Sequence, residues 1–230
     1  MAILPTDGRI ALATHLADAP IHFAWGIGEH WWNTRQLFDL ALDEAGRAAL
    51  PFAPVLSATV TNADTGGVYQ AGTDYILTSG GEIIRQPQGS MPLEARLVID
   101  CETGRPAMTG AEHGLVAEIG RRQANTVTFV VPDDTGDLET PGGQRWSISD
   151  IPTRHIYLGT HFGFSDAPDA TIREVAVFTD TITAEGVPPG QSYLEPGEVA
   201  SPGCLLLLDR LQPIFRSPAE TRSFAYVVTI

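Results

Sequence analysis

Glycine and proline divide this chain into short pieces, and that division constrains the fold more than any other feature of the sequence. The 230 residues include 23 glycines and 17 prolines, spread along the whole chain. Between them, apolar and polar residues alternate over short stretches, which is the pattern of half-buried β-strands. The sequence therefore predicts a mainly β protein, with a larger β-sandwich-like domain, one short helix and a small inserted β-module.

The first group of predicted strands forms the small β-module. Turns that contain glycine or proline separate these strands, and the Ser-Gly-Gly between the middle two is a signal for a tight hairpin. The predicted strands cover residues 55–62, 74–79, 82–87 and 95–102.

A second, larger sheet system is predicted in the C-terminal half. Its strands lie in the stretches TVTFVVPD, RHIYLGTHFGF, TIREVAVFTD, CLLLLDRLQPIFRS and RSFAYVVTI. The run CLLLLD is apolar at both parities, which predicts a central strand that is covered on both faces.

The last of these strands ends the sequence, where chain termini usually fray unless they are held. Four apolar residues share one parity in it, which predicts that this parity is the core face of a paired strand. The four residues are Phe224, Tyr226, Val228 and Ile230. Deletion of residues 224–230 is therefore expected to abolish soluble folding.

Helical signals are few. Thr109 and Glu112 have the spacing of a capping box, and Leu115 and Ile119 follow on one helical face, so a helix is predicted over residues 110–122. A second short helix is predicted within residues 33–50, with Gly46 and Pro51 as its boundaries.

These elements predict three segments. Residues 1–54 are expected to form a Trp-rich segment that packs on the C-terminal domain. Residues 55–103 would form the small β-module, and residues 104–230 a larger β-rich attachment or assembly domain.

The charge balance argues against two classes of partner. Fourteen cationic residues, all arginine, stand against 28 acidic ones, so the net charge is −14. Such a chain repels phosphate backbones and anionic membrane surfaces, whereas a basic protein partner suits it.

No apolar run approaches the roughly 20 residues of a membrane helix, and the N-terminus lacks a secretory signal. Synthesis in a host cytoplasm is therefore expected. The two cysteines, Cys101 and Cys204, are too few for a disulfide framework and are predicted to be buried free thiols.

The sequence contains no recognisable catalytic motif. His155 and His161 are predicted to share one face of a strand, but a metal site would need a further ligand. The acidic stretch PDDTGDLETPGG is interpreted as a solvated hairpin loop rather than as the site of a glycan hydrolase or a calcium ion. We therefore predict no enzyme, no catalytic residue, no cofactor and no metal.

The stretch WGIGEHWW has the most unusual composition in the chain. It holds Trp25, Trp31 and Trp32, with His30 among them. Clustered tryptophans plug the end of a β-sandwich, anchor a protein partner or stack on a sugar ring. The first two interpretations have equal weight, and these four residues are the candidates for an interface or a glycan site.

Several phrases together resemble a tail baseplate protein of the Mu-like transposable bacteriophages with long, non-contractile (siphovirus-type) tails, also found in prophages. They are FAWGIGEHWW, TGAEHGLVAEIGRRQANTVTFVVPDDTGDL, TIREVAVFTDTI and PGCLLLLDRLQPIFRSPAETRSFAYVVTI. The middle part is also similar to the attachment domain of tail-fibre and tail-collar proteins, in which an I-R-E strand lies in the β domain that docks fibres to the tail. Ile172 to Phe178 match that strand, although the turn after it is longer here.

The stretch YQAGTDYILTSGGEIIRQPQGSMPLEARLVID resembles a small β-module that recurs in virion proteins. Its G-x-D-Y phrase matches Gly72, Asp74 and Tyr75.

Both resemblances imply a structural component of the phage tail tip, present in a multi-copy ring or trimer in the virion. Such a component would link the tail hub to the fibres through protein interfaces. The alternative is a carbohydrate-binding module that contacts the host surface through Trp25, Trp31 and Trp32.

Overall fold

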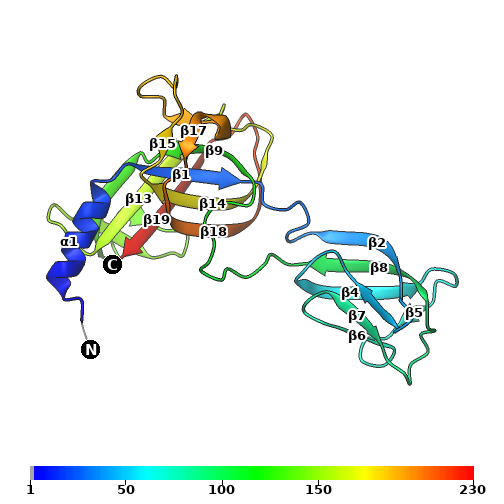
Figure 1. The fold of residues 1–230 in the computed structure, drawn as a ribbon. Coiled ribbons are helices and arrows are strands. Elements are labelled where there is room, and N and C mark those ends of the chain that lie inside the picture. Colours follow the sequence, from blue (N-terminus) through cyan, green and yellow to red (C-terminus); the bar gives the residue numbers. More distant parts are fainter. Residues whose placement is uncertain (1–2) are drawn as a thin grey trace. The chain divides into compact units, whose positions relative to one another are not determined.

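The computed structural model describes residues 3–230 and confirms a mainly β protein built from antiparallel strands (Figure 1). The chain divides into two compact units. The larger unit contains residues 1–28 and 113–230, and the smaller unit contains residues 29–112.

The larger unit is a sandwich of two five-stranded sheets, whose strands cross obliquely in Figure 1. The first sheet has the order β16 (Tyr193–Leu194), β9 (Glu118–Gln123), β1 (Ile21–Gly26), β14 (Thr171–Thr179) and β18 (Cys204–Phe215). The second has the order β11 (Leu138–Glu139), β12 (Arg145–Ile148), β10 (Thr126–Pro132), β13 (His155–Phe162) and β19 (Arg222–Thr229). A two-stranded sheet of β15 (Ile182–Thr183) and β17 (Val199–Ser201) and a 3-10 turn, η1 (Pro196–Glu198), complete this unit.

The core of the larger unit lies between the two sheets. Phe23 and Trp25 of β1, Leu158 and Phe162 of β13 and Val175 of β14 all have no exposed surface. The rings of Trp25 and Phe162 stack with centroids 3.6 Å apart. Full burial of an apolar side chain of this size adds about 1.5–3 kcal/mol to the free energy of unfolding. The side chains of these central strands therefore hold the two sheets together.

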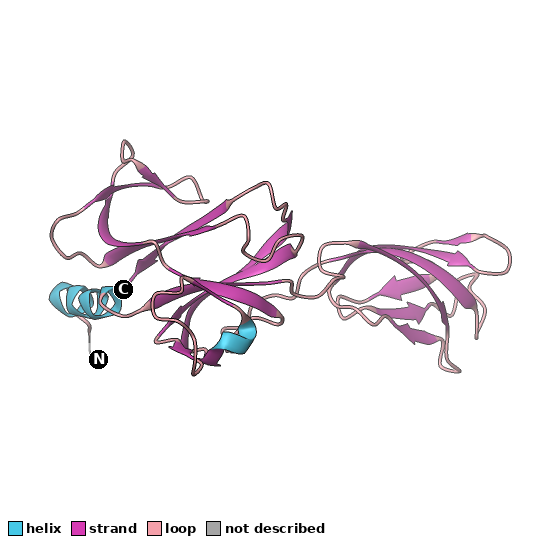
Figure 2. Cartoon of the chain, turned by 90° about the horizontal axis from the view of Figure 1, so that it is seen from above, coloured by secondary structure: helices cyan, strands magenta, loops and turns pink. Residues whose placement is uncertain are grey.

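The helix α1 (Thr6–Ala17) covers part of this core through its buried Ala13. The sequence did not predict this helix, because Pro5 at its N-cap makes no side-chain capping bond and only one of its residues, Ala13, is fully buried. Figure 2 shows α1 beside the sandwich strands of the larger unit.

The predicted helix over residues 110–122 is wrong. Glu112 does accept hydrogen bonds from the backbone N–H groups of Thr109 and Gly110, both at 2.8 Å, but these close a turn. The chain then extends into β9, which pairs with β1. Gly120 of β9 lies directly against the Tyr193 ring, where a side chain would clash, so tertiary packing overrides the local helical pattern.

The smaller unit contains the two other sheets. One has the order β2 (Arg35–Ala41), β8 (Arg96–Thr103), β4 (Val55–Asn62) and β5 (Val68–Tyr69), and the other β3 (Arg47–Ala49), β7 (Glu82–Arg85) and β6 (Tyr75–Leu77). The four strands predicted for the small β-module are therefore confirmed. The second predicted helix is wrong, because β2 and β3 lie within residues 33–50. This unit begins earlier and ends later than the predicted module, and it takes residues 29–54 out of the predicted N-terminal segment.

The G-x-D-Y phrase has a clear structural role in the smaller unit. The Asp74 carboxylate accepts hydrogen bonds from the backbone N–H groups of Gln70 (2.7 Å) and Ser90 (2.6 Å) and from the Ser90 hydroxyl (2.9 Å). These hydrogen bonds lower the pKa of Asp74, and the bond from Gln70 has the largest effect. Tyr75 donates its hydroxyl proton to the carbonyl of Ala58 at 3.1 Å. The phrase thus joins the loop after β7 to β6 and β4.

Candidate interaction surface

One side of the larger sandwich is open. β18 ends the first sheet and β19 ends the second, so the prediction of a central strand at CLLLLD is wrong. The two strands follow each other in the chain and lie across from each other, because Tyr226 donates a 3.1 Å hydrogen bond to Asp209. Within residues 3–230, no further strand pairs with the outer edge of either one.

The core is incompletely covered along this side. Residues of β18 and β19 that face the core are only half-buried, although the core residues of β1, β13 and β14 are fully buried. The half-buried residues are Leu206, Leu207, Leu211, Ile214, Phe224, Tyr226 and Val228. We call β18 and β19 with these side chains the open edge.

The opposite face of β18 is also apolar. Leu205 and Leu208 pack there with Phe178 and with Leu115 of the segment that precedes β9. This covering loop explains why β18 is apolar at both parities without being a central strand. At the end of β18, Phe215 is 75% exposed.

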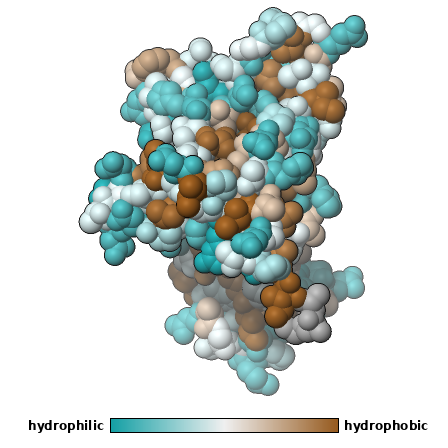
Figure 3. All heavy atoms as spheres, turned by 90° about the vertical axis from the view of Figure 1, so that its left-hand side faces the viewer, coloured by the Kyte–Doolittle hydropathy of each residue, from teal (hydrophilic) through white to brown (hydrophobic). Residues whose placement is uncertain are grey.

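The open edge has some of the features that normally protect a sheet edge and lacks others. Arg210 is a buried charge, Pro213 has no backbone N–H, and the register of β18 shifts twice against β14. The strand is nevertheless 12 residues long, and the whole chain contains no lysine. Figure 3 gives a contrast: on the face that it shows, hydrophobic side chains are scattered among polar ones. The open edge is thus the candidate interaction surface of the larger unit.

A buried ion pair anchors β18 to β14. Glu174 has no exposed surface, and its carboxylate accepts hydrogen bonds from Arg210 Nε at 3.4 Å and from the Val116 backbone N–H at 2.8 Å. Arg210 is itself buried. Since an unpaired buried charge is costly, this pair fixes the position and register of β18.

A second buried arginine supports the other end of the same sheet. Arg121 makes two 2.7 Å hydrogen bonds to the Glu118 carboxylate, and its guanidinium lies 4.5 Å from the centroid of the Phe178 ring. Burial, together with the charge of Arg121, lowers the pKa of His22. All these charges are paired within the fold, which is a structural arrangement rather than a catalytic one.

The tryptophan candidates are divided between the two units. Trp25 lies in the core of the larger unit with no exposed surface, and Trp32 is 2% exposed within the smaller unit. Neither ring is available to a sugar or a protein partner, as the interpretation of a core plug predicts. Trp31 is half-buried, and the centroid of its ring lies 5.4 Å from that of the Phe52 ring. His30 is exposed.

The histidines predicted on one strand do share a face of β13. His155 Nδ1 lies 2.8 Å from the Thr229 hydroxyl, and His161 Nδ1 lies 3.0 Å from the Ser223 hydroxyl. Within residues 3–230, no group of three histidine, cysteine or acidic residues is placed to hold a metal ion.

The acidic stretch forms the predicted hairpin. Asp133 accepts hydrogen bonds from Ser147 and Thr135, which lower its pKa, and Asp134, Asp137 and Glu139 are exposed.

The two cysteines are free, but only one of them is buried. Cys101 is buried as predicted, and burial raises the pKa of its thiol. Cys204 is exposed because it begins β18 at the open edge, so the prediction of a second buried thiol is wrong.

Comparison with known proteins gives the family. Residues 1–39 and 99–230 match the model of a family described as "Baseplate wedge 3 tail fiber network component". The chain belongs to this family. The family is a structural component of the phage baseplate, so this member has a structural role in the phage tail. No curated protein matches the chain.

The part of this baseplate protein that the family model leaves unmatched, residues 40–98, lies within the smaller unit. The chain enters and leaves the smaller unit through paired segments. On the side of the larger unit, the backbone N–H of Ile27 donates a 3.0 Å hydrogen bond to the carbonyl of Ala117. On the side of the smaller unit, Arg35 of β2 pairs with Glu102 of β8. The family match therefore covers the whole larger unit and, in the smaller unit, residues 29–39 and 99–112. No helix within residues 3–230 is long and apolar enough to cross a membrane.

Proposed function

We propose that the chain is a structural subunit of the phage tail tip, where it links the tail hub to the fibres through protein interfaces. The observation that carries this proposal is the open edge. An extended segment of a neighbouring baseplate protein would add to β18 as a further strand, and its side chains would cover the half-buried leucines of the core. In strand addition of this kind, main-chain hydrogen bonds provide the affinity. Every second side chain of the added strand fits a pocket, and these contacts provide the specificity.

The charge of the chain favours a different protein as this neighbour. With a net charge of −14, two copies repel each other, whereas a segment with basic residues is attracted. Repetition of one such joint about the tail axis would place several copies in a ring or a trimer. The sequence resemblance to the Mu-like phages supports a long, non-contractile tail as the setting.

Substitutions at exposed positions of β18 test the joint without disturbing the core. Gln212 and Phe215 are exposed, so a double variant Gln212→Lys, Phe215→Lys should keep the fold and block strand addition. The matched control is Gln144→Lys, Phe164→Lys, which replaces the same residue types at exposed positions elsewhere.

Both variants are introduced into the virion and the particles are examined by negative-stain electron microscopy. We expect the edge variant to give tails with incomplete baseplates and the control variant to give normal tails. Complete baseplates in the edge variant would refute the joint at β18. Complete tails with baseplates and fibres in virions that lack the whole protein would refute the structural role itself.

A further inference from the structure

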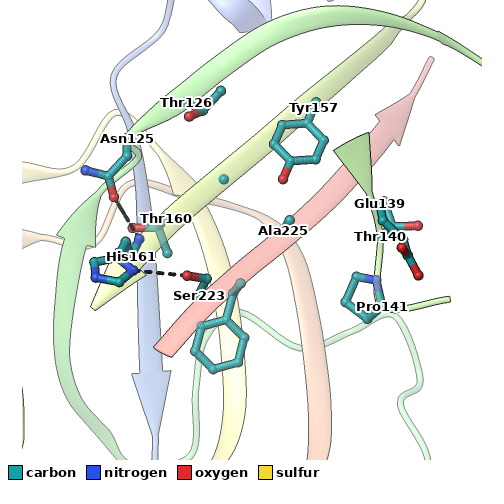
Figure 4. A pocket seen from close by; sticks show the side chains of 12 residues that line it. Asn125, Thr126, Glu139, Thr140, Pro141, Tyr157, Thr160, His161, Ser223 and Ala225 are labelled. Carbon is teal, nitrogen blue, oxygen red and sulfur yellow. Dashed lines mark hydrogen bonds between the residues drawn. The ribbon is translucent and has the colours of Figure 1, made fainter. Parts of the chain in front are cut away.

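A hollow lies on the outer face of the second sheet, on the side of β13 and β19 that faces away from the core (Figure 4). Its volume is about 530 Å³, which is within the range of small-molecule sites. The turn of the hairpin between β11 and β12 forms one wall with Glu139, Thr140 and Pro141.

Small residues create the floor of this hollow. Thr126, Gly159 and Ala225 are paired side by side across β10, β13 and β19. The ring of Tyr157, two residues along β13, leans over Gly159: a Cβ at that glycine would lie 3.0 Å from Tyr157 Cε1. The absence of a side chain at Gly159 therefore lets an aromatic ring rest against the sheet beside the hollow.

Polar groups border this floor. The Asn125 side-chain oxygen accepts from the His161 backbone N–H at 2.7 Å, and its NH₂ group points away from the middle of the hollow (Figure 4). Glu139 is exposed and presents a carboxylate, and Figure 4 shows the Tyr157 hydroxyl directed toward the middle of the hollow. His161 and Ser223, joined at 3.0 Å, close one end.

We propose that this hollow binds a neutral sugar unit of a bacterial surface polysaccharide. An aromatic ring offers an apolar platform to the C–H face of a sugar, while a carboxylate accepts from two sugar hydroxyls and the Tyr157 hydroxyl donates to a third. Glu139 is the charged residue of the lining and it is acidic, so anionic sugars are disfavoured. The Tyr157 hydroxyl is a donor at neutral pH, because the ordinary pKa of tyrosine lies well above 7 and burial raises that of Tyr157 further. This proposal stands independently of the joint at β18.

The test is a titration of the purified full-length chain followed by two-dimensional amide NMR. The probes are the methyl glycosides of glucose, galactose, mannose and N-acetylglucosamine, together with an array of neutral O-antigen oligosaccharides. We expect saturable shifts at the amides of Gly159 and Ala225 with at least one probe.

Three variants examine the parts of the site. Tyr157→Ala and Glu139→Gln should each weaken binding by about tenfold, and Gly159→Ala should weaken it because the new Cβ displaces the Tyr157 ring. The control is Asp137→Asn, an exposed carboxylate of the same hairpin outside the hollow, which should bind as the unchanged protein does.

Thermal unfolding of every variant verifies that it remains folded. Absence of saturable shifts with all probes would overturn the proposal, as would binding that Tyr157→Ala and Glu139→Gln leave unchanged. Shifts at the hollow with extended peptides but with none of the sugars would overturn it in favour of a protein ligand.

Discussion

Removal of residues 224–230 should unfold the larger unit rather than only prevent assembly. The truncation deletes most of β19, whose pairing with β13 runs from Arg222 to Thr229. It also removes four core side chains, those of Phe224, Tyr226, Val228 and Ile230, which the alternation in the sequence placed on the core face and the structure confirms there.

The size of this effect follows from burial. Half-buried side chains of this size contribute about 1.5 kcal/mol each, at the low end of the range for full burial, so their loss costs about 6 kcal/mol. Truncation also exposes Ile156, Leu158 and Phe162 of β13, which now have no exposed surface. Since domains of this size are stable by only about 5–15 kcal/mol, the remaining chain should not hold its fold.

The assay is soluble expression followed by size-exclusion chromatography and thermal unfolding monitored by circular dichroism. Two single variants on β19 provide a matched comparison. Tyr226→Ala removes a core-facing ring and its hydrogen bond to Asp209, and it should cost about 2–3 kcal/mol. Val227→Ala, at the opposite parity, should cost less than about 1.5 kcal/mol. A truncated chain that remains monomeric and unfolds cooperatively would refute the reasoning.

Three further predictions concern other parts of the structure. Arg210→Ala should destabilise the larger unit by about 3–5 kcal/mol in chemical denaturation because it leaves Glu174 buried without its partner, and an unchanged midpoint would contradict this. Replacement of residues 29–112 by a short glycine-serine linker should leave a larger unit that still unfolds cooperatively in thermal scans; a product that is only aggregated would contradict the two-unit division. The pKa of Asp74 is depressed in the folded state, so its stabilising effect is present above the ordinary value of 3.8 and is lost as the pH falls through the lowered folded value. Asp74→Asn should therefore weaken the smaller unit at neutral pH and flatten its acid unfolding profile, and a profile parallel to that of the unchanged protein would contradict this.

Strands were predictable from this sequence where the pattern is local. The alternation in residues 222–229 and in the four module strands reflects one buried and one exposed face, which neighbouring residues reveal by themselves. The helix over residues 110–122 was wrong for the opposite reason. Its capping-box spacing forms a real local turn, but contact between Gly120 and Tyr193, far apart in sequence, selects a strand.

The position of a strand within a sheet was not predictable. β18 is apolar at both parities because a loop with Leu115 covers its outer face, and a central strand shows the same pattern. The division of the tryptophan cluster was not predictable either, since residues that are near each other in the chain belong to the cores of two different units. The hollow beside Tyr157 gave no signal, because its lining comes from four separate segments of the chain.

A cryo-electron microscopy map of the assembled tail tip is the most direct test of the central claim. We expect an extended segment of a neighbouring chain paired with β18, with the half-buried leucines of β18 covered by its side chains. A map in which the chain occupies the baseplate with the outer edge of β18 facing solvent would contradict the proposed joint.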